Sequence, residues 1–354
     1  MSTDPCTLST DRVLFCYNKY LSMNKFVKIL LIGLSAIVIL SIISMTRFWW
    51  LQRAEKEVIG VSFSQVQAQR FGSSWKDNYT SLIDELGFRH LRVATYWDRI
   101  EPEPDKYDFS EIDFMIDEAK KRDAKLTLVV GQKVIRVPEC YYPTWLDKNN
   151  PQEVETRVNK MIQAVAQRYK DESTIEAWQL ENEFLLRSFG DCPSRNLTRE
   201  ALAKELNTLK SIDTSRPIVL TQSDQVGWPV RGPFGDIYGF SMYRFVWSPI
   251  GYYRYPQSGI YNWWKASLIS WYASQKTKVH ELQAEPWGKV GNENLDHETS
   301  KQTMSPHQLL ANLEYARQTQ IKRIDLWGSE WWYAARNDGH PEMWETVKKI
   351  SNKD

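Results

Sequence analysis

The sequence predicts an α/β fold of the (β/α)8 or TIM-barrel class, preceded by one transmembrane helix. Short apolar runs alternate with longer amphipathic segments from residue 58 onward, and there are eight such runs. A charge-free apolar segment comes before them. Eight buried parallel strands, most of them followed by a helix, are typical of a closed parallel barrel.

The apolar segment Ile29–Met45 carries no charge and no proline over its 17 residues, about the shortest length that crosses a bilayer. Lys25 and Lys28 precede it, and Trp49 and Trp50 follow it. This arrangement is typical of a helix whose basic N-terminal side stays in the cytoplasm and whose far end carries an aromatic belt.

Three regions follow from this segment. We expect a short cytoplasmic tail over residues 1–28, a transmembrane anchor over residues 29–47 and an extracytoplasmic barrel over residues 55–354. A cleaved signal peptide is the alternative. A long N-terminal region and the poor cleavage site at Ser44-Met45-Thr46 favour an uncleaved anchor.

The eight apolar runs are the expected strands, because each is short and bounded by polar or turn-forming residues. They cover residues 59–63, 90–94, 125–131, 175–180, 218–221, 237–241, 278–282 and 323–327. A doubly wound sheet is the alternative fold. It usually carries a glycine-rich phosphate loop after its first strand, and the stretch GVSFSQVQAQRFG from residue 60 is not one.

Amphipathic segments between the runs are the expected helices. In residues 109–122, Ile112, Met115, Ile116 and Ala119 share one face at spacings of three and four. The same pattern recurs in residues 153–169, 198–210, 262–274 and 305–320. Residues 222–236 are too rich in glycine and proline for a full helix.

The amino-acid composition indicates which classes of ligand the protein is expected to bind. The net charge of +1 gives no indication of nucleic-acid binding. The 16 Trp and 17 Tyr residues exceed what most cores need, and aromatic faces suit sugar rings. The five His residues show no metal-ligand spacing, so we expect neither a metal nor a cofactor. Cys140 and Cys192 each follow a predicted strand and are expected either to form a disulfide or to remain as two buried thiols.

In such barrels the functional site lies at the carboxyl ends of the strands. These ends carry carboxylates, amides, an arginine and aromatic residues: Arg92, Gln132, Glu181, Asn182, Glu183, Tyr243, Glu281, Glu285, Trp287, Trp327, Glu330, Trp331 and Trp332. This inventory suits cleavage of a glycosidic bond, which needs one protonated and one ionised carboxyl group.

The pair Glu181 and Glu183 ends one predicted strand. Strand alternation would place both side chains on one side, with Glu183 nearer the barrel mouth and therefore able to reach a substrate. We expect Glu181 to be an ordinary solvated loop residue.

Four segments resemble glycoside hydrolase clan A, the group that includes family 5 cellulases and mannanases. They are WQLENE at residues 178–183, TYWDRIEPEPDKYDFSEIDFMID at 95–117, KVHELQAEPWG at 278–288 and DLWGSEWW at 325–332. The likeness covers about residues 58–350. Phe184 stands where family 5 members often have proline, which indicates a divergent member.

The resemblance implies a retaining hydrolase that acts on a β-linked oligo- or polysaccharide. Glu183 would be the general acid/base, and Asn182 would bind the sugar 2-hydroxyl. Glu281 would be the nucleophile, with Glu285 as the alternative, and Arg92 and Tyr243 would orient it. Trp327 would lie under the reacting sugar; Trp287 and Trp331 are expected either as further sugar platforms or as packing residues.

Two alternatives from other classes remain. A barrel that has lost catalysis would bind glycans without cleaving them, but it would lack one of the two carboxylates. A metal-dependent lyase would need a ligand cluster, and the sequence shows none.

Overall fold

The computed structural model describes residues 10–187, 189–223 and 232–351, with side chains from residue 25 onward. Eight parallel strands close a barrel in the order β1-β10-β9-β6-β5-β4-β3-β2. The strands are β1 (Val58–Phe63), β2 (His90–Ala94), β3 (Lys125–Val130), β4 (Ile175–Leu180), β5 (Ile218–Ser223), β6 (Ile237–Met242), β9 (Lys276–Gln283) and β10 (Arg323–Trp327). The predicted (β/α)8 fold and its eight strands are confirmed.

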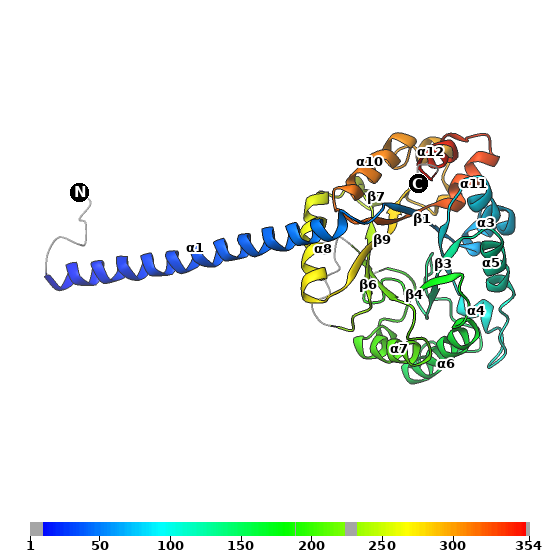
Figure 1. Cartoon of the computed structure of the whole chain (residues 1–354), viewed down its shortest axis with the longest axis horizontal. Coiled ribbons are helices and arrows are strands. Elements are labelled where there is room, and N and C mark those ends of the chain that lie inside the picture. The colour runs from blue at the N-terminus through cyan, green and yellow to red at the C-terminus, as the bar shows by residue number, and fades with distance from the viewer. Residues whose placement is uncertain (1–9, 188, 224–231, 352–354) are drawn as a thin grey trace.

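Helices surround the barrel (Figure 1). They are α2 (Gln65–Arg70), α3 (Trp75–Asp84), α4 (Trp97–Ile100), α5 (Ser110–Lys121), α6 (Pro151–Tyr169), α7 (Arg199–Ile212), α8 (Gly259–Tyr272), α9 (His297–Ser300), α10 (Pro306–Arg317), α11 (Ser329–Asn337) and α12 (Glu342–Ser351). A further helix, α1 (Thr10–Gln52), precedes them in the chain and projects from the barrel (Figure 1). The five predicted barrel helices are confirmed as α5, α6, α7, α8 and α10. The antiparallel hairpin of β7 (Phe245–Ser248) and β8 (Gly251–Arg254) was not predicted.

Local sequence explains where the helices begin. The side chain of Asn150 accepts a hydrogen bond from the backbone N–H of Glu153 at the start of α6, and Thr198 does the same for Ala201 in α7. Such N-caps satisfy amide groups that have no partner within the helix. The predicted apolar face of α5 is buried against the barrel, as the spacing of Ile112, Met115 and Ile116 indicated.

The prediction that residues 222–236 form no full helix falls partly on residues 224–231, which lie outside the described residues. Strand β5 extends to Ser223, and residues 232–236 contain no helix. The chain therefore reaches β6 without a helix in the described part of this connection.

Helix α1 contains an apolar stretch, Lys25–Gln52, in which an 18-residue window has a mean hydropathy of 2.7. It is the one helix among the described residues that is long and apolar enough to cross a membrane. It projects away from the barrel (Figure 1). Most of its Leu, Ile and Val side chains between Ile29 and Ile43 are exposed, whereas Ser44 and Phe48 are buried where the helix meets α8.

Candidate active site

The carboxyl ends of the strands open into a cavity of about 650 Å³. Its lining combines acidic, basic and aromatic side chains: Arg70, Arg136, Glu139, Asn182, Glu183, Phe189, Tyr243, Tyr255, Glu281, Glu285, Trp287, Glu293 and Trp327. Six residues singled out from the sequence therefore share one cavity, namely Asn182, Glu183, Tyr243, Glu281, Trp287 and Trp327, together with the alternative Glu285.

Glu281 lies within β9 and is held by two donors. Nη1 of Arg92 donates to Oε1 at 2.9 Å, and the hydroxyl of Tyr243 donates to Oε2 at 3.0 Å. The Arg92 side chain is fully buried. A buried guanidinium stabilises an ionised carboxylate beside it and fixes the direction of its oxygens.

Arg92 also orders the neighbours of Glu281. It donates to Gln179 Oε1 at 2.6 Å and to Asn182 Oδ1 at 2.7 Å. Gln179 donates to the same Asn182 oxygen at 3.3 Å. Because its oxygen accepts both bonds, Asn182 has its NH₂ group to offer to a ligand in the cavity.

Glu183 lies in the turn that follows β4. Its backbone N–H donates to Thr221 Oγ1 at 2.9 Å, and the Ser241 hydroxyl donates to its carboxylate. Burial, followed by the negative charge of Glu281, raises the pKa of Glu183 to about 7. A carboxyl group with this pKa keeps its proton in a substantial fraction of molecules near neutral pH.

A polar chain joins the two carboxyl groups. Ser241 Oγ, which binds Glu183, lies 3.1 Å from Nε2 of His280. The same nitrogen is 3.6 Å from Oε1 of Glu281. Burial, followed by the nearby Arg92 charge, lowers the pKa of His280 well below its usual value, so the imidazole is neutral. Glu183 and Glu281 therefore belong to one electrostatic unit.

Glu181 differs from the expectation of a solvated residue on the same side as Glu183. Strand β4 ends at Leu180, and Glu181 and Glu183 have positive φ angles of 61° and 44°, so strand alternation no longer applies. Glu181 is buried and accepts bonds from the backbone N–H groups of Gln132 and Lys133, both at 2.7 Å. It therefore anchors the loop after β3 and does not reach the cavity.

Two further residues, Gly131 and Glu205, lie close to the Glu181 carboxylate. A side chain at Gly131 would collide with the Glu181 carboxylate, because a Cβ there would lie 2.2 Å from Oε1. The buried Glu205 carboxyl of α7 bonds to Glu181. Burial and this neighbour raise the pKa of Glu205 well above its usual value, so the pair holds a proton between them.

Glu285 lies two residues beyond β9, in a second ionic cluster of the cavity. Its Oε1 accepts bonds from Arg136 Nη1 at 2.5 Å and from the indole Nε1 of Trp327 at 2.7 Å. Arg136 also donates to the buried Glu330 of α11. Glu281 and Glu285 therefore each have an arginine partner, and only Glu281 interacts with Glu183 strongly enough to shift its pKa.

The predicted aromatic platforms have different positions. Trp287 lines the cavity, with its ring centroid 5.1 Å from that of Tyr243. Trp331 is buried in the hydrophobic core and is not among the residues that line the cavity. It lies in α11, a helix that the sequence reading did not identify, and the helical turn directs it into the core.

A disulfide joins Cys140 and Cys192. Of the two alternatives expected from the sequence, a disulfide or two buried thiols, the structure contains the disulfide. It connects the loop after β3, which carries Arg136 and Glu139, to the loop after Glu183. Glu139 also pairs with the buried Lys133 at 3.0 Å. Burial outweighs this pairing and raises the pKa of Glu139 to about 8.

Sequence reasoning missed Arg136 and Glu139 as residues of the cavity, and it missed Ser241 as the hydrogen-bond donor to Glu183. Arg136 and Glu139 lie in a loop, for which no periodic signal exists, and Ser241 is small and common. Arg92 could be singled out because a charged residue within an apolar strand is unusual. A charged residue in a loop is normally solvated, so the burial of Arg136 and Glu139 is seen only in the folded structure.

One group of three metal-ligand side chains occurs within the described ranges, formed by His297, His340 and Glu342 with their donor atoms within 4.8 Å of one another. These residues do not line the cavity. The two imidazole rings stack with centroids 3.6 Å apart and planes 11° apart.

The mouth of this parallel barrel holds an arginine-bound carboxylate beside a second buried carboxyl group, and such a pair of carboxyl groups is what glycoside hydrolases use. The model of the cellulase family, glycosyl hydrolase family 5, matches residues 52–332. The chain belongs to glycosyl hydrolase family 5. Among curated proteins, no sequence matches it.

Several solved structures share the fold. The exo-β-1,4-mannosidase Op5Man5 of an Opitutaceae bacterium has a TM-score of 0.55 at 14% identity, over 84% of this chain and 59% of its own. A GH5_18 protein of Bifidobacterium longum, solved with Manβ1-4GlcNAc, has a TM-score of 0.57 at 12% identity, over 84% of this chain and 78% of its own.

The β-galactosidase of the haloarchaeon Halorubrum lacusprofundi has a TM-score of 0.57 at 13% identity, over 83% of this chain and 57% of its own. This chain thus spans less than two thirds of the mannosidase and of the galactosidase. Such low identities show a common fold and mark the chain as a divergent family member.

Proposed function

We propose that the protein is a retaining glycosidase that cleaves a β-linked oligo- or polysaccharide, with Glu183 as general acid/base and Glu281 as nucleophile. One observation carries the proposal: Glu281, anchored by Arg92 and Tyr243, is the charge that raises the pKa of Glu183 after burial itself. An ionised and a protonated carboxyl group within electrostatic reach are what glycoside cleavage requires.

In the first step, Glu281 attacks the anomeric carbon and forms an ester with the sugar. The bond from that carbon to the leaving oxygen breaks, and Glu183 gives its proton to this oxygen. The Asn182 NH₂ group lies in the same cavity and is available to donate to a sugar hydroxyl beside the reacting carbon.

In the second step, water replaces Glu281 on the anomeric carbon, and Glu183 accepts the proton of that water. Ester formation removes the negative charge of Glu281. Because that charge raises the pKa of Glu183, its removal lowers this pKa and favours the ionised form needed to act as a base.

Glu285 is assigned a role in binding. Its Oε1 is occupied by Arg136 and Trp327, and it lies beyond the strand in the cavity wall. The Trp327 indole beside it presents an apolar face suited to a sugar ring. β-Mannosides and β-galactosides enter the substrate panel because the structural relatives include a mannosidase and a galactosidase.

Helix α1 is proposed as an uncleaved anchor that holds the barrel on the extracytoplasmic side of a membrane. Its apolar stretch is exposed along most of its length, which suits contact with lipid. The Cys140–Cys192 disulfide is consistent with an oxidising compartment.

The test is hydrolysis of aryl β-mannosides, β-galactosides and β-glucosides, and of β-mannans and β-glucans, by the full chain in detergent. Glu183→Gln should lose about 10²–10⁴-fold in kcat on polysaccharide. It should lose less on a dinitrophenyl glycoside, whose leaving group needs no proton. Glu281→Gln should lose activity on both substrates, and Glu285→Gln should chiefly raise KM.

Rescue of the variants by azide distinguishes the nucleophile from the general acid/base. In Glu281→Ala, azide should restore turnover and give the α-glycosyl azide, because it attacks from the side that the nucleophile has vacated. In Glu183→Ala it should give the β-glycosyl azide. Rescue of Glu285→Ala with the α product would instead make Glu285 the nucleophile. Glycan binding by the wild type without any turnover would favour the catalytically inactive barrel.

A further inference from the structure

Helix α8 has an apolar face that the barrel does not cover. Ile260, Tyr261, Trp271 and Tyr272 are 60%, 40%, 50% and 46% exposed. With the half-buried Trp264 and Leu268 between them, they follow a spacing of three to four residues along one side of the helix. Soluble barrels normally present polar side chains on this outer face, so aromatic side chains exposed here indicate an environment other than bulk water.

The chain segment that contains α8 carries no negative charge. From Ile237 to His280 the chain contains no Asp or Glu, whereas it contains Arg and Lys residues. The one charged residue of α8, Lys265, is 1% exposed and turns inward over the Phe240 ring. The outer face of α8 is therefore free of charge.

Helix α8 is bound directly to α1 close to the end of its apolar stretch. The Trp264 indole donates to Ser41 Oγ at 3.0 Å, and the hydroxyls of Ser44 and Ser267 lie 2.9 Å apart. Figure 1 shows α1 crossing α8 as it leaves the barrel, and α8 lies on the side from which α1 projects. Helix α8 is therefore level with Ser41 and Ser44, near the barrel-side end of the apolar run of α1.

We propose that α8 lies in the interface of the lipid bilayer that α1 crosses, with Ile260, Tyr261, Trp271 and Tyr272 inserted among the headgroups. This inference rests on the anchor role proposed above for α1. Its partner is the bilayer surface itself, and the barrel is held against that surface in one orientation.

The level of α8 along α1 agrees with the depth at which interfacial helices lie in a bilayer. Ser41 is four residues from the end of the apolar run at Met45, which at about 1.5 Å per residue is about 6 Å along the helix. Interfacial helices bury their apolar face by about 5–10 Å. Trp and Tyr are the side chains that favour this zone, and they make up most of the exposed face of α8.

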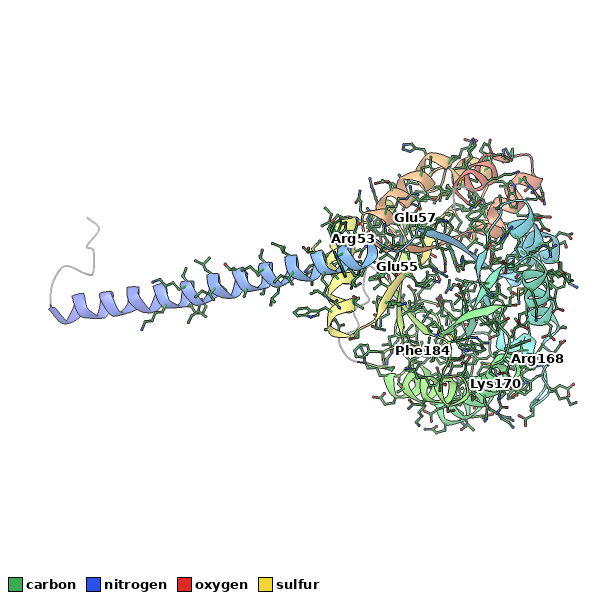
Figure 2. The ribbon with its side chains drawn as sticks, viewed as in Figure 1. Arg53, Glu55, Glu57, Arg168, Lys170 and Phe184 are labelled. Atoms are coloured by element: carbon green, nitrogen blue, oxygen red, sulfur yellow. A yellow bond between two sulfur atoms is a disulfide. The ribbon has the colours of Figure 1, made fainter. Side chains whose placement is uncertain are left out.

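The adjoining end of α1 carries side chains suited to headgroups. The Arg53 guanidinium lies 5.7 Å from the ring centroid of Trp49 and 5.2 Å from that of Trp50, and both Trp side chains are exposed. Figure 2 shows Arg53 where α1 reaches the barrel, beside α8. Phosphate groups would pair with this arginine while the indoles lie in the interface.

The experiment uses the full chain reconstituted in phosphatidylcholine–phosphatidylglycerol vesicles that contain a spin-labelled lipid. An environment-sensitive NBD fluorophore is attached to one cysteine at a time, in a background in which Cys6 and Cys16 are serine. Ile37→Cys reports on the anchor and Trp271→Cys on α8. Lys170→Cys is the exposed control, which Figure 2 shows away from α1 and α8.

The proposal predicts blue-shifted emission and strong quenching by the spin-labelled lipid at residues 37 and 271, and neither at residue 170. Quenching at 37 with none at 271 would overturn the α8 proposal and leave the anchor intact. No quenching at 37 would refute the anchor, and the α8 proposal with it. A label at 271 that is shielded but not quenched, with cross-linking between chains, would assign this face to a second copy.

A second experiment uses unlabelled protein to test whether contact with lipid stabilises α8. The double substitution Trp271→Ser and Tyr272→Ser should leave hydrolysis of a soluble aryl glycoside unchanged, because neither residue lines the cavity. It should increase the hydrogen exchange of α8 in vesicles and not in detergent. Equal exchange in vesicles for this variant and the wild type would contradict contact between α8 and lipid.

Discussion

The guanidinium of Arg136 lies over the indole ring of Trp327, with its central carbon 4.1 Å from the ring centroid. The same guanidinium bonds to the carboxylates of Glu285 and Glu330. Arg136 is 7% exposed. One loop residue thus compensates two buried carboxylates and supports the aromatic surface of the cavity.

Replacement of Arg136 by Met should therefore destabilise the fold. It leaves Glu285 and Glu330 without their cation, and breaking a buried ion pair costs about 3–5 kcal/mol. The measurement is the free energy of unfolding in urea at pH 7. Arg136→Met with Glu330→Gln should recover part of the loss, because one uncompensated charge is gone. A single variant that unfolds at the wild-type urea concentration would disprove this role.

The bond between Ser241 and Glu183 predicts a change in pH profile. The Ser241 hydroxyl lowers the pKa of Glu183, opposing the burial that raises it to about 7. Ser241→Ala removes this donor, so the pKa should rise and the alkaline limb of kcat/KM should move to higher pH. Ser248→Ala, in the β7–β8 hairpin, is the matched control. A limb that stays in place or moves to lower pH would contradict the assignment of that limb to Glu183.

The raised pKa of Glu183 also predicts an effect on stability. The folded protein holds this proton more tightly than the unfolded chain, so the wild type loses stability as the pH rises from about 4.5 through about 7. The loss is about 3 kcal/mol at higher pH.

Glu183→Gln cannot ionise and avoids this loss. The variant should therefore melt above the wild type at pH 8 and close to it at pH 5. Thermal unfolding at the two pH values measures the difference. A variant that is less stable than the wild type at pH 8 would show that the Glu183 carboxylate is well solvated or well paired.

The Cys140–Cys192 disulfide should contribute measurable stability. It joins residues 52 positions apart, for which a chain-entropy model gives about 4 kcal/mol. Reduction with dithiothreitol should lower the melting temperature. The double variant Cys140→Ser and Cys192→Ser should melt at the reduced value and no longer respond to the reductant. The control variant Cys6→Ser and Cys16→Ser should respond as the wild type does.

The sequence predicted much of the scaffold because periodicity is a local property. The strands are short and mostly apolar runs, and α5 has its apolar residues on one face, so their types follow from spacing. Helices α2, α3, α4, α9, α11 and α12 were not predicted. Trp331 and Trp332 were read from the sequence as strand-end aromatics, whereas the chain turns into α11 directly after β10.

The two carboxylates that follow β4, Glu181 and Glu183, show where reasoning from local sequence fails. Both were read as residues of one extended strand. The backbone instead turns with positive φ at each of them, so Glu181 enters the wall beside Gln132 and Glu205, and Glu183 faces the cavity. Side chains alternate between the two faces only while the chain remains a strand. Where the strand ends depends on contacts with neighbouring loops, which the local sequence does not reveal.

By itself, the sequence determined the eight-stranded barrel, the apolar N-terminal helix and the family, because these depend on hydrophobic periodicity and on motifs of contiguous residues. Only the tertiary structure decided that Glu181 is buried in the barrel wall, that Arg136 joins Glu285 to Glu330, and that Ser241 bonds to Glu183. The pKa of each carboxyl group depends on its burial and on charges brought from distant strands, and neither quantity is present in the chain before it folds.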